Sequence, residues 1–446
     1  MCGIFGYIGH REKSIPLVIK GLKKLEYRGY DSWGIASYID GSLFLQKQVG
    51  KISEVKLADF NDQKSSLSIG HTRWATHGGV TKKNAHPHAD PEKRVVVVHN
   101  GIIENYESIR DHFGKENFVS ETDTEVIAHL IGSFRTAHNF QESVLRAVRL
   151  LEGRYSIVVI DRDTNQLIAA RRGSPLIVGV GKGEYFLASD IPAFLEYTQE
   201  VMYLDDEEMV VIDGDALSQK LQGELKFFNI KTGELILKRL VNIDWQAESA
   251  EKGDYDHFML KEIMEQKDTI LRAINQDEKE IMKIAKAIKE SRGCFLSGCG
   301  TAGKVCMAAE YFFSMIASRH VNFSPASEFP IYHHFLRPES LLIVVSQSGE
   351  TADVLEAMKV AKSKGSKVLS LVNVQGSTIA RQSDYSLQIN AGPEKAVAST
   401  KAATSQLALL LLITYAMIDQ LQEGRRVLAE TASKVNDMLN AFSELH

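Results

Sequence analysis

A cysteine directly follows the initiator methionine in this chain. Because cysteine is small, Met1 can be removed, which would leave Cys2 with a free α-amine beside its thiol. The amine titrates near about pH 7.7–8.0 and the thiol near about 8.5, so the amine can take the thiol proton without a distant histidine. Cys2 is therefore a candidate N-terminal nucleophile. The alternative is an ordinary cysteine in a buried strand, since residues 3–8 form a mostly apolar run.

A guanidinium and an indole are adjacent at Arg73 and Trp74, and the pair Gly78-Gly79 follows them. This segment could bind a carboxylate through two parallel hydrogen bonds beneath a closing loop, or it could be only a strand end and a turn. Asp123 lies in an acidic stretch that opens an expected helix. Its carboxylate could pair with an ammonium group, or Thr122 or Asp123 could simply cap that helix.

Asn100 and Gly101 follow an expected strand at residues 95–99. An amide side chain beside an unhindered glycine N–H can stabilise the oxyanion of a tetrahedral intermediate. The other interpretation is a simple Asn-Gly turn, which is common between strands.

Two loops rich in glycine and serine follow expected strands in the C-terminal half, at residues 297–303 and 346–351. Each lies between a strand and a helix, where backbone N–H groups and hydroxyls can converge on an anion. Neither loop has the pattern of a dinucleotide fingerprint or a P-loop. A third loop at residues 392–401 adds to them, and three such loops indicate a phosphate site more strongly than one.

The elements that position these residues differ between the two halves of the chain. In the first half we expect strands at 3–8, 67–71, 95–99, 156–161, 166–170, 185–188 and 208–212, with helices at 14–25, 124–134 and 141–151. In the second half, after a charged helical segment at 258–273, we expect strands at 293–297, 341–346, 367–372 and 385–389 and helices at 304–317, 352–364 and 399–420. The pattern predicts a layered α+β domain and then a doubly wound α/β domain with a parallel sheet.

The composition excludes several other classes. With 446 residues, 44% hydrophobic residues and a formal charge of −5, the chain is typical of two or three globular domains and not of a protein that binds nucleic acid or an anionic membrane. The four cysteines fit no zinc pattern, and His86 and His88 lack acidic or cysteine partners at regular spacing, so we expect no metal. Without an export signal or spanning segment, a cytoplasmic location is expected.

Five motifs, in order, carry a resemblance to a known family. They are Cys2-Gly3-Ile4, Tyr27-Arg28-Gly29-Tyr30-Asp31-Ser32, the segment 71–78, His99-Asn100-Gly101 and Thr122-Asp123-Thr124-Glu125. They resemble the class II glutamine amidotransferases, and among these the glutamine:fructose-6-phosphate aminotransferases. The resemblance implies an Ntn-hydrolase-type αββα sandwich, no organic cofactor, and D-glucosamine 6-phosphate as the product made from L-glutamine and fructose 6-phosphate.

Roles for the residues follow from the same resemblance. Cys2 would attack the glutamine amide while Asn100 and Gly101 hold the oxyanion. Arg73 would bind the substrate α-carboxylate and Asp123 its α-ammonium, and the loop that closes over glutamine would contain Trp74, Thr76 and His77. The family usually has a small residue where this chain has Trp33, so the resemblance does not indicate how the side chains around Trp33 pack.

The C-terminal loops resemble a flavodoxin-like sugar-isomerase (SIS) domain. The resemblance implies that the phosphate is held by Ser346, Gln347, Ser348 and Thr351, with Thr301 and Val397 also lining the pocket. The family commonly has serine at the position of Ala302, so one hydroxyl is missing, which is worth about 0.5–1.5 kcal/mol.

The resemblance also sets the expected domains: an amidotransferase domain at 2–217, a connector and helical lead-in at 218–280, a SIS domain at 281–425 and a helical segment at 426–446. Family members have a second SIS domain, and this sequence ends before one, so we expect glutamine hydrolysis without sugar amination. A homodimer is expected from the resemblance and the apolar helix 406–418. Alternatives are another class II amidotransferase, although no Ser-Gly-Gly-x-Asp loop is present, or a glutaminase regulated by a sugar phosphate.

Overall fold

The computed structural model describes residues 2–219, 224–244 and 252–443 and divides into two compact units, 1–247 and 248–446. Each unit is considered by itself. Met1, whose removal would free the Cys2 amine, lies outside the described residues, as do parts of the expected connector and the last three residues of the expected C-terminal helical segment.

Two antiparallel sheets form the first unit. The eight-stranded sheet has the order β15-β11-β9-β10-β1-β4-β2-β3, and the seven-stranded sheet the order β14-β13-β12-β8-β7-β6-β5. The strands of the first are β1 (Gly3–Gly9), β2 (Ser32–Ile39), β3 (Ser42–Val49), β4 (Leu67–Arg73), β9 (Ile177–Gly181), β10 (Glu184–Ala188), β11 (Glu200–Tyr203) and β15 (Val241–Asn242). Those of the second are β5 (His88–Ala89), β6 (Val95–Ile103), β7 (Gly153–Asp161), β8 (Gln166–Arg172), β12 (Glu208–Asp213), β13 (Leu225–Asn229) and β14 (Leu235–Ile236).

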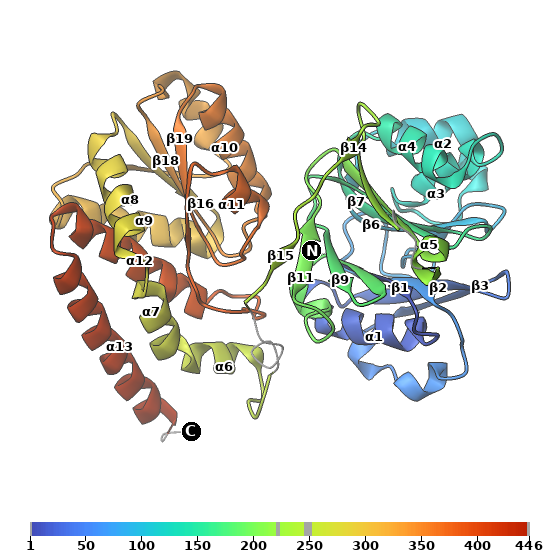
Figure 1. Cartoon of the computed structure of the whole chain (residues 1–446), viewed down its shortest axis with the longest axis horizontal. Helices are drawn as coiled ribbons and strands as arrows, with labels where there is room; N and C mark the ends of the chain where they lie inside the picture. Colours follow the sequence, from blue (N-terminus) through green and yellow to red (C-terminus); the bar gives the residue numbers. More distant parts are fainter. Residues whose placement is uncertain (1, 220–223, 245–251, 444–446) are drawn as a thin grey trace. The chain divides into compact units, whose positions relative to one another are not determined.

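Helices cover the outer faces of the stacked sheets (Figure 1). Helix α1 (Ser14–Lys24) packs on the eight-stranded sheet, and α3 (Glu125–Phe134) and α4 (Phe140–Leu150) pack on the seven-stranded sheet. The shorter helices are α2 (Tyr106–Phe113) and α5 (Gly214–Ser218). An apolar core fills the space between the sheets. The order helix, sheet, sheet, helix confirms the predicted αββα sandwich.

Strand β1 shows how this layering places the N-terminus. Its Ile4 and Ile8 face the core between the sheets, whereas the Phe5 ring lies against Gly21 of α1, where an added Cβ would come within 2.8 Å of the ring. A strand buried on both faces needs apolar residues at successive positions, as residues 3–8 have. Pairing of Gly3 with Thr72 of β4 then brings Cys2 beside the end of β4.

The structure differs from the sequence prediction in several strands. The hairpin β2–β3 was not predicted, and β6 continues to Ile103 instead of ending near His99. The region expected to be an irregular connector contributes β14 and β15, which are edge strands of the two sheets, and β13, which pairs with β14. Edge strands are half exposed and therefore more polar, which is why their sequence resembles a connector.

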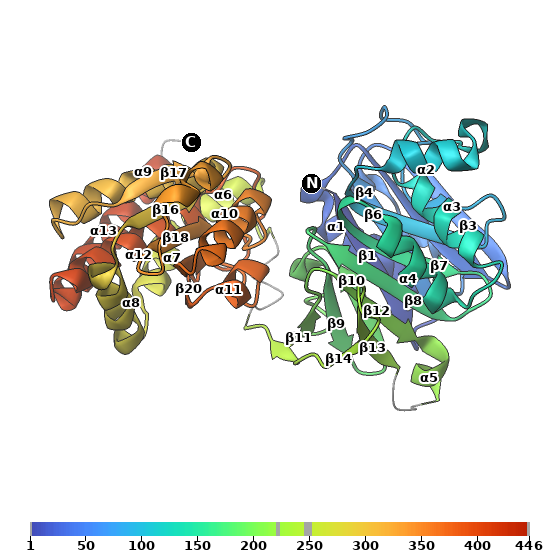
Figure 2. The same ribbon diagram turned by 90° about the horizontal axis from the view of Figure 1, so that it is seen from above.

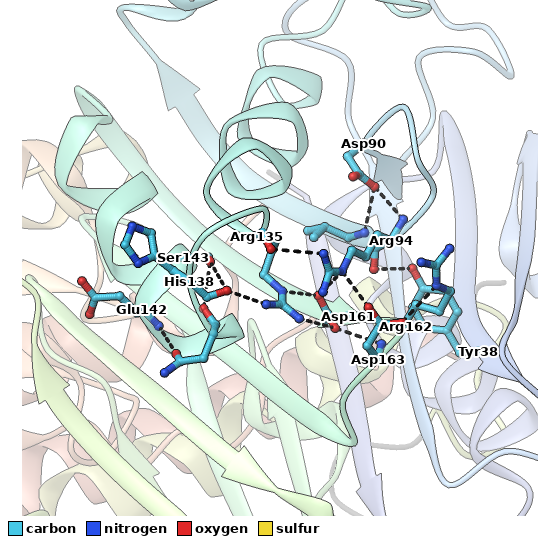
Figure 3. A network of polar contacts seen from close by, with 12 residues as sticks. Tyr38, Asp90, Arg94, Arg135, His138, Glu142, Ser143, Asp161, Arg162 and Asp163 are labelled. Carbon is cyan, nitrogen blue, oxygen red and sulfur yellow. Dashed lines mark hydrogen bonds and ion pairs between the residues drawn. The ribbon is translucent and has the colours of Figure 1, made fainter.

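A buried ion-pair network ties α3 to the seven-stranded sheet (Figure 3). Arg135, just after α3, donates through Nε to Asp161 at the end of β7, with 2.7 Å between Nε and Oδ2. Arg94 approaches the same carboxylate at 3.8 Å and pairs with Asp163 at 2.7 Å. Tyr38 of β2 donates to the Arg94 carbonyl at 2.8 Å, so the network also links the two sheets.

A parallel five-stranded sheet of order β17-β16-β18-β19-β20 forms the second unit. Its strands are β16 (Cys294–Gly298), β17 (Asn322–Pro325), β18 (Leu341–Ser346), β19 (Lys367–Val372) and β20 (Tyr385–Gln388). Its helices are α6 (Phe258–Met264), α7 (Gln266–Ile274), α8 (Glu278–Glu290), α9 (Gly300–Met315), α10 (Ala352–Ser363), α11 (Thr378–Gln382), α12 (Lys401–Met417) and α13 (Leu421–Ser443). Helices α8, α9 and α13 lie on one side of the sheet and α10 and α11 on the other (Figure 2), which confirms the flavodoxin-like fold.

Helix α12 corrects one argument made from the sequence. Its side chains Leu409, Leu410, Leu412 and Ile413 are fully buried in the core of the second unit. The apolar character of this helix is therefore explained by its own domain and does not indicate a dimer surface. Among the helices in the described part of the chain, none combines the length and hydropathy that a bilayer crossing requires.

Candidate functional site

The half-buried Cys2 lies one residue before β1, and its thiol faces the chain that leaves β4. Trp74 donates its backbone N–H to Cys2 Sγ at 3.2 Å, and Sγ lies 3.5 Å from the Trp74 carbonyl oxygen. This proximity depends on Gly3, since an added Cβ there would lie 2.6 Å from Thr72 Oγ1 and 2.9 Å from Leu25 Cβ. The sequence Cys-Gly therefore lets a nucleophile approach the end of β4.

Positive charge surrounds the thiol. Arg28 donates through Nε to the Cys2 carbonyl at 3.1 Å and pairs with Asp190, with 3.3 Å between Nη1 and Oδ2. Tyr27 also donates to Asp190, at 2.5 Å. Burial raises the pKa of the Cys2 thiol, while the Trp74 N–H and the Arg73 and Arg28 charges lower it. The resting group is therefore a thiol, and attack requires a base beside it.

Asn100 and Gly101 lie inside strand β6 and not in a turn after it, so the interpretation as an Asn-Gly turn is wrong. Gly101 pairs with Tyr155 of β7 and has φ +136°. A Cβ at Gly101 would lie 1.9 Å from the Arg154 carbonyl oxygen, so this position requires glycine. Asn100 thereby faces the start of β1 across the two sheets.

Three groups fix the Asn100 amide. Nδ2 donates to the Cys2 carbonyl at 3.1 Å and to Ser189 Oγ at 2.9 Å, while Oδ1 is 2.9 Å from His71 Nε2. His71 Nε2 is also 3.0 Å from the His99 carbonyl oxygen. Because both of its partners are acceptors, Nε2 carries the hydrogen. Both Nδ2 hydrogens therefore already have acceptors. A substrate oxygen that accepts from Nδ2 must share a hydrogen with the Cys2 carbonyl or with Ser189 Oγ.

Arg73 and the residues after it form a folded-back loop. The buried guanidinium donates to the carbonyls of His77, Gly78 and Gly79, at 3.4 Å for Gly78 and 3.2 Å for Gly79. Trp74 is 41% exposed, and its ring lies 5.3 Å from that of Tyr30. In this arrangement Arg73 holds the loop.

The remaining residues of this loop lie nearer the surface. Thr76 is exposed and His77 half-buried, with the His77 ring 5.8 Å from Tyr106. Asp31 accepts the Ala75 N–H at 2.7 Å, which fixes the start of the loop.

Asp123 is buried just before α3, and its carboxylate accepts the Ile103 N–H at 2.8 Å. Residue Thr124 occupies the N-cap position of α3, and no side chain caps the helix there. The interpretation of Thr122 or Asp123 as a cap is therefore wrong. Asp123 instead connects the start of α3 to the end of β6, close in sequence to Gly101.

Four buried histidines lie behind these residues. The rings of His71 and His86 stack at 4.2 Å, and His86 is 5.0 Å from His88 and 6.4 Å from His99. Thr124 Oγ1 contacts His99 Nδ1 at 2.9 Å and His86 Nε2 at 3.2 Å. Within residues 2–219, 224–244 and 252–443, no group of histidine, cysteine and acidic side chains could hold a metal. The cluster is a packed scaffold between Asn100 and the loop of Asp123.

Acid should destabilise the first unit through this scaffold. Burial lowers the pKa of His71 from 6.5 to about 3 and lowers those of His86, His88 and His99 as well. As pH falls, these histidines are protonated in the unfolded chain before they are protonated in the folded one. Their contribution to the free energy of unfolding is therefore present above pH ~6.5 and is lost as pH falls. The effect of His71 alone should lower the free energy of unfolding by about 1.4 kcal/mol at pH 5.5, compared with neutral pH.

Urea unfolding at pH 7.5 and 5.5 measures this effect through tryptophan fluorescence, since Trp33 and Trp74 lie in the first unit. The pH-dependent loss should be about 1.4 kcal/mol smaller in His71→Asn than in the control His112→Asn, which changes an exposed histidine. Equal losses in both variants would contradict the assignment of His71 as a buried neutral group.

In the second unit, two of the loops expected to bind an anion lie at one edge of the sheet. Strands β16 and β18 are neighbouring and parallel, so the segments after Gly298 and Ser346 leave the same end. Ser346 Oγ lies 2.9 Å from Thr351 Oγ1 and accepts the Gly349 N–H at 3.0 Å. Gly349 has φ +67°, which glycine adopts readily.

The other sugar-site candidates are half-buried or exposed. Gln347 and Ser348 are half-buried, and Ser348 Oγ accepts the Glu350 N–H at 3.2 Å. Helix α9 begins at Gly300 instead of Lys304, so Thr301 is exposed in the first helical turn. Val397 is 87% exposed on the loop before α12.

Residues important to the geometry include several that the sequence did not indicate. Ser189 accepts the Ile4 N–H at 2.8 Å as well as the Asn100 amide, and no local pattern signals this role. Arg28 lies in the motif Tyr27-Arg28-Gly29-Tyr30-Asp31-Ser32, and its position there could have suggested that it faces the site. The role of His71 follows only from its contact with Asn100.

Comparison with known proteins gives two family matches and close relatives. Residues 71–196 match the glutamine amidotransferase domain model, and residues 287–416 match the SIS domain model. The chain is 45% identical over 419 residues to the glutamine–fructose-6-phosphate aminotransferase (isomerizing) of Pyrococcus horikoshii, covering 93% of this chain and 69% of that protein. It is 43% identical over 457 residues to the enzyme of the same name from Aquifex aeolicus, covering 100% of this chain and 74% of that protein.

A solved structure is also similar. It is the glutamine phosphoribosylpyrophosphate amidotransferase from B. subtilis complexed with ADP and GMP, with a TM-score of 0.45 and 18% identity. The similarity covers 83% of this chain and 81% of that one.

Proposed function

Because the chain belongs to the glutamine–fructose-6-phosphate aminotransferase (isomerizing) family, we propose that Cys2 releases ammonia from L-glutamine for the amination of D-fructose 6-phosphate to D-glucosamine 6-phosphate. The observation that carries the first step is the 3.1 Å hydrogen bond from Asn100 Nδ2 to the Cys2 carbonyl. It brings an amide donor to the nucleophile from a strand of the other sheet. Family membership sets aside the other class II amidotransferases.

The chemistry begins with loss of Met1. The α-amine of Cys2 then takes the thiol proton, and the thiolate attacks the side-chain amide carbon of glutamine. The carbonyl π electrons move to oxygen, and the resulting oxyanion is stabilised by Asn100 Nδ2 and the Gly101 N–H. His71 supports this step because its Nε2 hydrogen holds Asn100 Oδ1 and so fixes which end of the amide faces the thiol.

Collapse of the intermediate breaks the carbon–nitrogen bond. The α-ammonium of Cys2 returns its proton to the leaving nitrogen, so that ammonia departs and a γ-glutamyl thioester remains on Cys2. A water molecule, deprotonated by the same amine, attacks the thioester and releases glutamate. Cys2 and its amine are thereby restored.

Substrate glutamine is held at its two charged ends. Arg73 would bind the α-carboxylate, and the buried carboxylate of Asp123 would bind the α-ammonium. Since Arg73 holds the loop carbonyls, glutamine binding and closure of the loop with Trp74, Thr76 and His77 are coupled through one guanidinium.

Fructose 6-phosphate binds in the second unit under this proposal. The phosphate lies at the N-terminal end of α10, held by backbone N–H groups and by Ser346, Gln347, Ser348 and Thr351. Thr301 and Val397 would lie near the sugar. We further propose that the enzyme acts in the cytoplasm as a homodimer without a metal or organic cofactor, and sedimentation of the purified protein would measure its subunit number.

Assays of the 446-residue chain test the proposed reaction. Glutamate formation from glutamine is expected, and calorimetry should detect binding of fructose 6-phosphate. Glucosamine 6-phosphate is measured in the same samples, so that hydrolysis and transfer are separated. Absence of glutamate formation from protein that has lost Met1 would contradict the glutaminase step, and absence of fructose 6-phosphate binding would contradict the sugar site.

A further inference from the structure

The loop that joins β20 to α12 is held by a carboxylate from outside the sheet. Glu262, on α6, is only 2% exposed. Its Oε1 accepts the N–H of Lys395 at 2.5 Å and that of Ala396 at 3.0 Å, and Oε2 lies 3.2 Å from the Ala396 nitrogen. One buried side chain therefore satisfies two successive backbone donors of the loop.

Further contacts tie both ends of this loop to the same pair of helices. Glu265, between α6 and α7, accepts from Lys401 Nζ at 2.5 Å. Arg272 of α7 donates through Nε to the Asn390 carbonyl at 3.0 Å. Within the loop, Glu394 accepts the Thr400 N–H at 2.9 Å and so fixes the start of α12. Glu262 acts at the middle of the segment that these contacts define.

Glu262 holds the main chain of this loop in place at Lys395 and Ala396. A buried carboxylate is stable only when hydrogen bonds satisfy it, and charged acceptors form bonds about twice as strong as neutral ones. Without Glu262, two backbone N–H groups would lose their acceptor, which is unfavourable if they stayed buried. The loop would instead move toward water. Val397 follows Ala396 directly, so its place depends on this anchor.

We propose that Glu262 is a positioning residue for the sugar part of the sugar-phosphate ligand, acting through the main chain of Lys395 and Ala396. The inference rests on the proposed function, because it assumes that the loop of Val397 faces the sugar. The phosphate is assigned to a different loop, residues 346–351 after β18. The two parts of the ligand can therefore be tested separately.

Calorimetry on the full chain with fructose 6-phosphate and with inorganic phosphate provides the test. Glu262→Ala should raise the Kd for fructose 6-phosphate about tenfold and leave that for inorganic phosphate within about twofold. Glu262→Gln keeps one acceptor oxygen in place and should raise the first Kd only about threefold. The control Glu290→Ala removes an exposed carboxylate from α8 and should change neither. Glutamine hydrolysis should be unchanged in all three variants.

Each contrary outcome has its own meaning. An unchanged Kd for fructose 6-phosphate in both Glu262 variants would overturn the inference and leave the proposed function standing. Equal loss of both ligands would show a general structural role and would also overturn it. If the unchanged chain binds no fructose 6-phosphate, the proposed sugar site itself fails. Should Glu262→Ala not fold, the Glu262→Gln ratio of the two dissociation constants decides the question.

Discussion

Replacing Cys2 by alanine is expected to lower glutamate formation from glutamine by at least about 10⁴-fold, because the only proposed nucleophile is lost. The oxyanion donors would remain, but no sulfur could form the thioester. Discontinuous assays of glutamate at saturating glutamine measure the effect. Circular dichroism and urea unfolding should show an intact fold, since Cys2 is half-buried and precedes the first strand.

The matched control is Cys306→Ala, which removes a thiol from the buried face of α9 in the other unit. Its glutaminase rate should stay within about twofold of the original, even if its stability falls. Comparable losses in both variants, or a Cys2→Ala enzyme with more than a few per cent of the original rate, would show that another group attacks glutamine.

Asn100→Ala is expected to lower kcat about 10²- to 10³-fold, the usual effect of losing one oxyanion donor. The KM for glutamine should change much less, because the charge on the substrate oxygen develops only in the transition state. Steady-state kinetics over a range of glutamine concentrations separate the two constants. Asn117→Ala, an exposed asparagine beyond α2, is the control and should leave both constants unchanged. A kcat within about threefold of the original would remove Asn100 from the mechanism.

Part of the fold follows directly from the sequence. Strands β18 and β19 have the predicted ends, at Leu341–Ser346 and Lys367–Val372. A central parallel strand is buried on both faces and so has a continuous apolar run that no turn residue interrupts. The same argument holds for β1. Such strands are the ones that a single sequence indicates most clearly.

The hairpin β2–β3 was missed for the opposite reason. Polar and small residues interrupt both strands, and β3 is largely exposed or half-exposed. The sequence did contain a turn signal between them, the dipeptide Asp40-Gly41. In the structure these two residues have φ +50° and +75°, as a tight hairpin turn requires. This hairpin also contains Trp33, which is 3% exposed opposite Thr72, so the larger side chain is accommodated in the sheet.

The candidate nucleophile and oxyanion residues could be named from the sequence, but their supports could not. Asn100 contacts Ser189, which is 89 residues away, and the Cys2 carbonyl, which is 98 residues away. Such contacts depend on the stacking of two sheets and leave no periodic pattern. Ala302 stands where the family commonly has serine, and the expected loss of phosphate affinity from the missing hydroxyl stays a prediction.

Trapping the acyl-enzyme tests the central claim most directly. The chain would be mixed with glutamine, quenched in acid during turnover, digested and analysed by peptide mass spectrometry. A γ-glutamyl group is expected on the N-terminal peptide, attached to Cys2, and the active protein should carry no Met1. An active enzyme that retains Met1, or a γ-glutamyl group found on a residue other than Cys2, would contradict it.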